Sequence, residues 1–273
     1  MRAFAPANIS LIFETYDAEL PHGRGSLGVG ITLDEGAVVS VNPADEPGIF
    51  VHGESWEFPT VAQVMRELTD RPLRLDIQAA FPFGCGFGMS GASALAAAIA
   101  IDAFLDLGNA RGDLGMIAHR AEVDHATGLG DVGGQFNGGI MIKTRKFEPL
   151  QVSQLPVKAE NLHVRIFGPI HTPEVIGSRQ KLLAVNAAGH SALAELGRCG
   201  ADLTLDRLFA VSLQFAENSG LLQSERLVQC IRDAQAAGGR ATMVMLGEAA
   251  VSTRPFPGSR RVRVLHGGVR LLP

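Results

Sequence analysis

Short apolar runs, separated by glycine, proline and aspartate, fill the first 80 residues. Their lengths and β-branched content predict strands at residues 8–14 ("NISLIFE"), 27–33 ("LGVGITL"), 37–41 ("AVVSV"), 48–53 ("GIFVHG") and 73–79 ("LRLDIQA"). Between the last two, apolar residues recur at helical spacing at Val61, Val64, Met65 and Leu68. This stripe predicts a helix over Thr60–Leu68, with Thr60 as its N-cap.

The rest of the chain is dominated by helical patterns. Two helices are predicted over 89–107 and 113–125, followed by a glycine-rich segment and a strand at 138–143. Beyond residue 150 the predicted elements are a strand at 162–167, helices at 172–196, 205–218 and 222–237, and strands at 241–246 and 261–265. Because strands and helices do not strictly alternate, the sequence predicts an α+β fold, divided into residues 1–150 and 151–273.

Composition narrows the class of protein. Apolar residues make up 46% of the chain and charged residues 19%, and the net charge of −4 predicts neither a nucleic-acid nor a membrane partner. The basic segment 259–270 alternates as a solvated strand face does. Three cysteines without a CxxC pair indicate neither a disulfide framework nor a zinc site, and no signal peptide is evident, so a cytoplasmic location is expected.

The segment "PFGCGFGMSGA" (residues 82–92) places glycines between a predicted strand and a helix N-terminus. Unpaired N–H groups and the positive end of the helix dipole favour an anion there, and glycines let the backbone approach it. The first lysine of the chain is Lys143, so a phosphate site in the first half depends on backbone N–H groups, arginine or metal. We therefore predict that this segment binds phosphate rather than forming only a tight turn.

Two other glycine-loop motifs fit less well. The Walker pattern needs a lysine that this segment lacks. The dinucleotide pattern is matched by Gly86, Gly88 and Gly91, but no second strand ending in an acidic residue follows about 20 residues later. A nicotinamide or flavin enzyme is therefore the least favoured alternative.

Residues 82–94 ("PFGCGFGMSGASA") resemble the PxGxGLGSSAA loop of the GHMP kinases, the superfamily of galactokinase, homoserine kinase and mevalonate kinase. Residues 4–14 ("FAPANISLIFE") resemble its N-terminal APGKVNLxGE strand, and residues 127–139 ("TGLGDVGGQFNGG") resemble its SGxDxxxxxxGG segment. Residues 25–36 and 118–131 are most similar to the archaeal pantoate kinase branch. The chain departs from the superfamily at Asn8, where a lysine is frequent, and in residues 237–246 ("AGGRATMVML"), where the C-terminal glycine motif is degenerate.

The resemblance implies a two-domain fold, with an N-terminal part like ribosomal protein S5 domain 2 and a ferredoxin-like C-terminal part. It implies Asp131 as the catalytic residue, and Ser90 and Glu122 as ligands of Mg²⁺, with Asp124 as the rival of Glu122. A transition-metal site of His119, Glu122 and His125 is disfavoured because the two histidines diverge by about 120° on a helix. The ATP-binding residues it implies are Gly84, Cys85, Gly86, Phe87, Gly88, Met89, Ser90 and Gly91.

The implied reaction is ATP-dependent phosphorylation of the terminal hydroxyl of pantoate to 4-phosphopantoate, in coenzyme A biosynthesis. Arg24 and Ser26 are the predicted partners of the pantoate carboxylate, and Asn8 is predicted to hydrogen-bond the substrate. Two alternatives stay open: a kinase for another small alcohol, homoserine-like or mevalonate-like, and a catalytically silent nucleotide-binding homologue. The resemblance also implies a possible homodimer.

Overall fold

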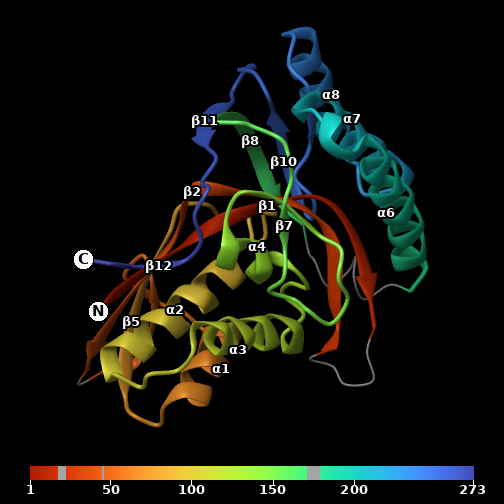
Figure 1. Cartoon of the computed structure of the whole chain (residues 1–273). Coiled ribbons are helices and arrows are strands. Elements are labelled where there is room, and N and C mark those ends of the chain that lie inside the picture. Colours follow the sequence, from red (N-terminus) through yellow and green to blue (C-terminus); the bar gives the residue numbers. More distant parts are fainter. Residues whose placement is uncertain (18–22, 45, 171–178) are drawn as a thin grey trace.

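Two antiparallel-rich sheets, with helices on one face of each, make up the fold (Figure 1). The computed structural model describes residues 1–17, 23–44, 46–170 and 179–273. One sheet has eight strands and the other has four. The predicted α+β class is therefore confirmed. Among the described residues no helix combines the length and hydropathy needed to cross a bilayer.

A long hairpin forms the centre of the larger sheet. Strand β1 (Arg2–Tyr16) pairs antiparallel with β2 (Gly25–Pro43), from Arg2 opposite Ser40 to Tyr16 opposite Gly25. The prediction of two separate strands at 27–33 and 37–41 was wrong, because β2 continues through Gly36. The start of β1 was also missed, since Pro6 suggested a break; instead the register shifts between Pro6 and Asn8, an irregularity at which a strand tolerates proline.

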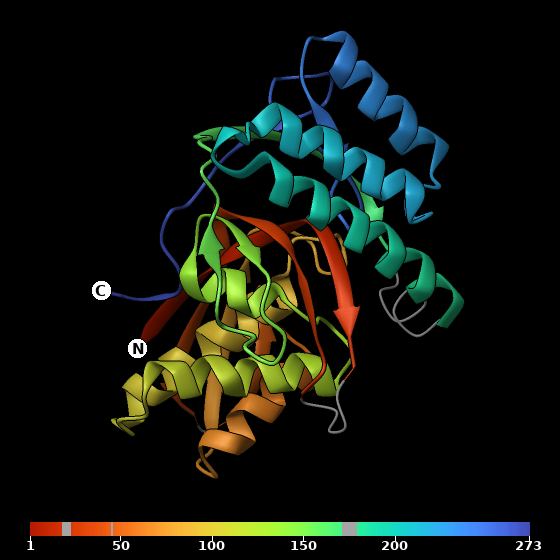
Figure 2. The same ribbon diagram turned by 45° about the vertical axis from the view of Figure 1, so that its right-hand side comes forward.

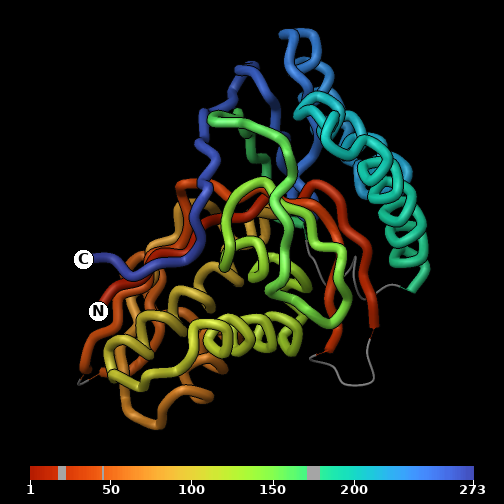
Figure 3. The backbone as a smooth tube through the Cα atoms, in the orientation of Figure 1, coloured from red at the N-terminus to blue at the C-terminus, as the bar shows by residue number. Residues whose placement is uncertain are grey.

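The larger sheet recruits strands from both ends of the chain. Its order is β12-β1-β2-β5-β3-β4, and β6 pairs with β2 and β7. The additional strands are β3 (Gly48–Val51), β4 (Glu54–Ser55), β5 (Leu73–Ala79), β6 (Ile140–Lys143), β7 (Ser153–Gln154) and β12 (Arg270–Leu272). The short strands β7 and β12 were not predicted. Because β12 pairs with β1, the two ends of the chain lie side by side (Figure 3); the division near residue 150 stays a prediction.

Three helices cover one face of the larger sheet: α1 (Pro59–Leu68), α2 (Met89–Leu105) and α3 (Arg111–Asp124). Helix α2 contacts β1 and β2 on one side and α1 and α3 on the other, so every residue from Gly91 to Ile101 is buried. Small alanines suit this closely packed position. The prediction that Thr60 is the N-cap of α1 was wrong. Phe58 is the N-cap, and Pro59 is the first helical residue, where the missing N–H of proline costs no hydrogen bond.

The smaller sheet has the order β11-β8-β10-β9. Its strands are β8 (Asn161–Pro169), β9 (Ala241–Met243), β10 (Gly247–Ser252) and β11 (Arg260–Arg263). Helices α6 (Arg179–Cys199), α7 (Leu205–Asn218) and α8 (Glu225–Ala236), with the short turn Gly200–Asp202 between the first two, lie together on one side of it (Figure 2). Strand β10 was not predicted, and the predicted helical residues 172–178 lie outside the described residues.

The two sheets meet at the glycine loop. The Ile170 N–H, at the end of β8, donates to the Gly84 carbonyl at 3.0 Å, and the Met245 N–H donates to the Ser10 carbonyl of β1 at 3.1 Å. Helix α6 lies against β1, where Gly189 contacts the Phe13 carbonyl. The loop and the centre of β1 are thus held between both layers.

Candidate active site

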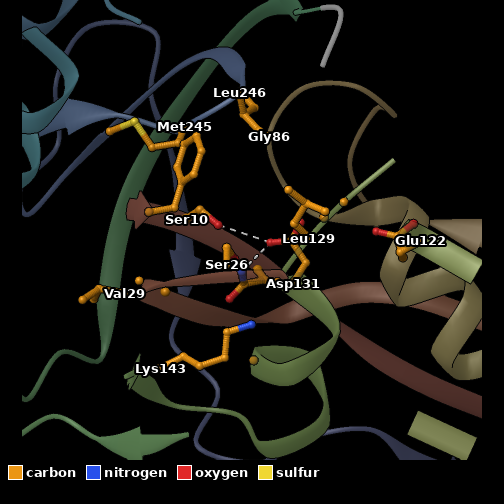
Figure 4. A pocket seen from close by; sticks show the side chains of 18 of the residues that line it. Ser10, Ser26, Val29, Gly86, Glu122, Leu129, Asp131, Lys143, Met245 and Leu246 are labelled. Carbon is orange, nitrogen blue, oxygen red and sulfur yellow. Dashed lines mark hydrogen bonds between the residues drawn. The ribbon is translucent and has the colours of Figure 1, made fainter. Parts of the chain in front are cut away.

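A pocket lies where the glycine loop, the middle of β1 and β2, β6 and the Met245–Leu246 turn come together (Figure 4). Its polar lining includes Asn8, Ser10, Ser26, Ser90, Glu122, Thr127, Asp131 and Lys143. Apolar residues such as Val29 and Met141 line it as well.

The glycine loop turns its side chains into the core and its backbone toward the pocket. Cys85, Phe87 and Met89 are each no more than 3% exposed, and Phe87 stacks on Phe81 with ring centroids 4.2 Å apart. Gly84, Gly86, Gly88, Met89 and Ser90 line the pocket, whereas Cys85, Phe87 and Gly91 are not part of its lining. Burial raises the pKa of the Cys85 thiol, which suits a packing role rather than a reactive one.

Gly88 forms the junction between loop and helix. It is the N-cap of α2 with φ at +62°, a left-handed conformation that glycine adopts without strain. The N–H groups of the first helical turn follow directly, and they have no acceptors within the helix. The start of α2 therefore has N–H groups available where the sequence predicts an anion site, and the binding of an anion there stays a prediction.

Asp131 is the first residue of α4 (Asp131–Asn137), a helix that the sequence analysis missed because Gly133 and Gly134 disfavour helices. Its Oδ1 accepts from Asn8 Nδ2 at 2.7 Å and from Ser10 Oγ at 3.2 Å. Burial raises the pKa of this carboxyl group, and the bonds from Asn8 and Ser10 and the charge of Lys143 oppose that rise. These bonds hold Oδ1, whereas Oδ2 accepts no hydrogen bond from the described residues.

Glu122, on α3, is 2% exposed beside the start of α2. Thr127 Oγ1 donates to its Oε1 at 2.6 Å. A Cβ at Gly128 would collide with Oε2, so this glycine keeps a space open beside the carboxylate. Desolvation raises the pKa of Glu122 to about 7, partly offset by hydrogen bonds from Ser90 and Thr127.

The rival acid, Asp124, is exposed and accepts from Gln63 Nε2 at 2.8 Å, and it does not line the pocket. Ser90 Oγ instead lies in the cluster around Glu122, 3.5 Å from Thr60 Oγ1, and both Ser90 and Glu122 line the pocket. The structure thus brings together the two side chains predicted to bind the metal. Among the described residues no group of three His, Cys, Asp or Glu could hold a metal alone.

Lys143, at the end of β6, lines the pocket but was not among the site residues predicted from the sequence. It is 5% exposed, and its Nζ has no hydrogen-bond partner in the described part of the chain. Desolvation lowers its pKa to about 8, and the charge of Asp131 counteracts this shift. Figure 4 shows its side chain reaching toward Asp131 and Ser26. A buried ammonium without a hydrogen-bond partner is costly, and an anionic ligand could accept its hydrogen bonds.

The predicted substrate-binding residues lie in different places. Asn8 is bonded to Asp131, and Ser26, 9% exposed, lines the pocket with its Oγ close to Gly130. Arg24 pairs with Asp17 at 3.1 Å on the surface and does not line the pocket. Its role in binding substrate stays a prediction. His119 is 2% exposed and bonds the backbone of Arg24, so it supports the start of β2.

Comparison with known proteins fits this geometry. The family model for the GHMP kinases N terminal domain matches residues 57–139, which include the glycine loop, Glu122 and Asp131. A pantoate kinase of Methanocaldococcus jannaschii is 30% identical over 249 residues, which cover 89% of this chain and 89% of that protein. The chain belongs to the pantoate kinase family of GHMP kinases.

Further relatives agree with this membership. A pantoate kinase of Methanospirillum hungatei is 27% identical over 92% of this chain and 87% of that protein. A solved phosphotransferase related to the CoA biosynthesis pathway has a TM-score of 0.85 at 26% identity, covering 98% of this chain and 97% of its own. A homoserine kinase from Cytophaga hutchinsonii (TM-score 0.70, 17% identity, 100% and 97% covered) shares the fold. As a member of this family, the chain is an ATP-dependent phosphotransferase that acts on an alcohol.

Proposed function

We propose that this chain phosphorylates the terminal hydroxyl of pantoate, using ATP, and so forms 4-phosphopantoate for coenzyme A biosynthesis. The observation that supports this best is the buried Lys143, which lies in the same pocket as Asp131 and the glycine loop and whose Nζ has no hydrogen-bond partner among the described residues. Lys143 offers a cation for the carboxylate of the acceptor, and the loop offers N–H groups for the phosphates of ATP. Asp131 offers a proton acceptor for the hydroxyl of the acceptor. The named activity of the relatives supports the same acceptor.

Lys143 would bind the carboxylate of pantoate. Its charge is desolvated, so its attraction for an anion is stronger than in water. Ser26 Oγ lies beside Gly130, and a Cβ added at Gly130 would come within 3.3 Å of Lys143 Nζ. The hydroxyl of Ser26 and the ammonium thus approach one spot from two strands. On this proposal, the acid end of the acceptor lies between β2 and β6.

Asp131 would accept the proton of the hydroxyl that attacks the γ-phosphate. Asn8 and Ser10 hold Oδ1, and Oδ2 has no hydrogen-bond partner among the described residues, so Oδ2 is the oxygen proposed to take the proton. A carboxyl pKa raised by burial makes it a better proton acceptor than an exposed aspartate. As the proton leaves, the alkoxide oxygen bonds to the γ-phosphorus, and the bond from phosphorus to the bridging oxygen of ADP breaks.

The backbone N–H groups at the start of α2 would bind the phosphates of ATP. Glu122 and Ser90 fit a Mg²⁺ ion, because Glu122 Oε2 faces a space that a Cβ at Gly128 would fill. One or two protein oxygens, with phosphate and water oxygens, are the usual ligands of Mg²⁺. When bound, the ion supplies charge neutralisation across the β- and γ-phosphates. We place this enzyme in the cytoplasm.

Asn8 is the feature that favours a silent homologue, since a lysine is frequent there in the superfamily. In this structure Asn8 donates a hydrogen bond to Asp131, and the ammonium of Lys143, on strand β6, lies in the same pocket. The loss of charge at residue 8 is therefore compatible with turnover. A neutral sugar acceptor such as galactose would give the Lys143 ammonium no anion to hydrogen-bond.

A substrate panel tests the proposal. The purified protein with Mg·ATP is offered pantoate, homoserine, mevalonate or galactose, and ADP release is followed alongside mass spectrometry of the product. We expect turnover with pantoate and a product that is heavier by one phosphoryl group. Turnover only with another acceptor, or nucleotide binding without turnover, would refute the proposed acceptor.

A further inference from the structure

Gln135 lies one helical turn after Asp131 on α4, and it is fully buried. Residues four apart share a face of a helix, so the amide and the carboxylate point in the same direction. That face meets the glycine loop: Gln135 Nε2 donates to the Gly88 carbonyl at 2.7 Å. A single short helix thus connects Asp131 with the loop at the start of α2.

Gly88 lies against both residues. A Cβ built on it would come within 2.7 Å of Gln135 Nε2 and 3.2 Å of Cβ and Cγ of Asp131. The main chain of the loop therefore contacts the side chains of α4 without a side chain of its own between them. The distance from Asp131 to the start of α2 is set at this contact.

The bond from Gln135 also fixes the direction of one peptide group. In a trans peptide, the carbonyl of Gly88 and the N–H of Met89 point in opposite directions. Gln135 and the Ala92 N–H both donate to this carbonyl, at 2.7 Å and 3.0 Å. The Met89 N–H, one of the free donors of the first helical turn, is thereby directed away from α4. Gly88 and Met89 both line the pocket.

We propose that Gln135 is a positioning residue for phosphoryl transfer, setting both the aim of the Met89 N–H and the distance between the phosphates and Asp131. The inference rests on the proposed roles of the loop and of Asp131. Packing alone does not explain an amide here. Gln135 Oε1 is buried without a hydrogen-bond partner among the described residues, so an apolar side chain of equal size would avoid that cost.

Replacing Gln135 with methionine tests this, because Gln135→Met keeps the volume and removes the donor. We expect kcat to fall by about 10- to 100-fold, as for a small misplacement of reacting groups, with the KM for ATP within about threefold of wild type. The melting temperature should not fall. The matched control is Asn137→Ala on the same helix, whose exposed side chain bonds Gly133 and Leu150 carbonyls; its kcat should equal that of wild type.

A double-mutant cycle separates positioning from a general structural effect. If Gln135 acts through Asp131, then adding Gln135→Met to Asp131→Asn should lower kcat little further. A Gln135→Met enzyme with wild-type kcat would overturn the inference, and losses that multiply would overturn the part of it that acts through the distance to Asp131.

A readout without an acceptor keeps the inference separate from the proposed substrate. The amide proton of Met89 is followed by NMR while a non-hydrolysable ATP analogue is added. The wild type should show a large shift of this resonance, and Gln135→Met a clearly smaller one. An equal shift in both proteins would overturn the inference even if no acceptor in the panel is phosphorylated, whereas a smaller shift would support it and leave only the acceptor in question.

Discussion

Lys143 and Asp131 face one pocket from β6 and α4, and each charge shifts the pKa of the other, yet the ammonium makes no hydrogen bond within the described residues. A buried pair of opposite charges normally closes into a salt bridge. Here the groups stay apart, which leaves room for a molecule with an acid at one end and a hydroxyl at the other.

Replacing Lys143 with methionine should stabilise the protein and weaken acceptor binding. The pKa of Lys143 is lowered from 10.5 to about 8, so at pH 7 the folded state holds an unfavourably buried charge. We expect the free energy of unfolding to rise by about 1–3 kcal/mol at pH 7. That gain should shrink as the pH rises from 8 toward 10.5. Thermal melts across this range measure it.

The same variant tests acceptor binding against Arg24. Lys143→Met should raise the KM for pantoate at least about tenfold, because a desolvated charge pair is lost. Arg24→Ala is the comparison, since Arg24 pairs with Asp17 at the surface. A larger rise in KM for Arg24→Ala than for Lys143→Met would indicate that Arg24 binds the pantoate carboxylate and would contradict our assignment.

The pH dependence of kcat/KM should be bell-shaped, because this parameter reports the ionisations of the free enzyme. The acid limb follows Glu122, whose pKa is raised to about 7 and which must lose its proton to bind a cation. The alkaline limb follows Lys143, which loses its charge above its pKa of about 8. In Lys143→Arg the alkaline limb should disappear, since a guanidinium stays charged. If the alkaline limb is unchanged in Lys143→Arg, it arises from the ionisation of a group other than Lys143.

Glu122→Gln should raise the Mg²⁺ concentration needed for half-maximal activity by about tenfold or more, because an amide oxygen is a weaker ligand than a carboxylate. Titration of Mn²⁺ binding to the protein with a non-hydrolysable ATP analogue provides a second readout. Asp124→Asn, two residues along the chain and exposed, is the matched control and should behave as wild type. Equal effects of the two substitutions would exclude Glu122 as the specific ligand.

Asp131→Asn should fold and bind nucleotide, yet lose about 10²- to 10⁴-fold in kcat, the usual contribution of a general base. The amide keeps the size of the side chain and can still meet Asn8 after rotating. Calorimetric binding of the ATP analogue, measured beside turnover, distinguishes lost chemistry from lost binding. Turnover within a few-fold of wild type would remove Asp131 from the proposed mechanism.

The sequence predicted most of the larger elements of the fold. Periodicity identified α2, α3 and α7 because their patterns are long, and β5 was found with its observed bounds. Short pieces were missed: β7, β10 and β12 depend on pairing with distant strands, which local patterns do not record. Helix α4 was missed because Gly133 and Gly134 are poor helix formers. Its position depends on hydrogen bonds of Asp131 and Gln135 to distant parts of the chain, which a local pattern does not reveal.

Only part of the candidate site could be predicted, because a sequence does not show which distant residues meet in space. The glycine loop, Ser90, Glu122 and Asp131 were predicted from the resemblance to GHMP kinases, and in the structure they line one pocket. Arg24 was chosen by charge and by its glycine neighbours, which say nothing of where a side chain lies in space. Lys143 had one available signal: it is the first lysine of the chain, at the end of an apolar strand directly after the Asp131 segment. Only strand pairing between β6 and β2 places it in the pocket. The homodimer stays a prediction.

The hydrogen bond from Ile170 to Gly84, and the contact of Gly247 with the Cys85 carbonyl, join the loop to the second sheet. A fragment that stops near residue 150 would lack both, as well as the strand that pairs with β1 at the chain's end. Such a truncated protein should therefore fail as a minimal nucleotide-binding module, and engineering that grafts the loop onto another scaffold would have to transplant its support from both halves of the chain.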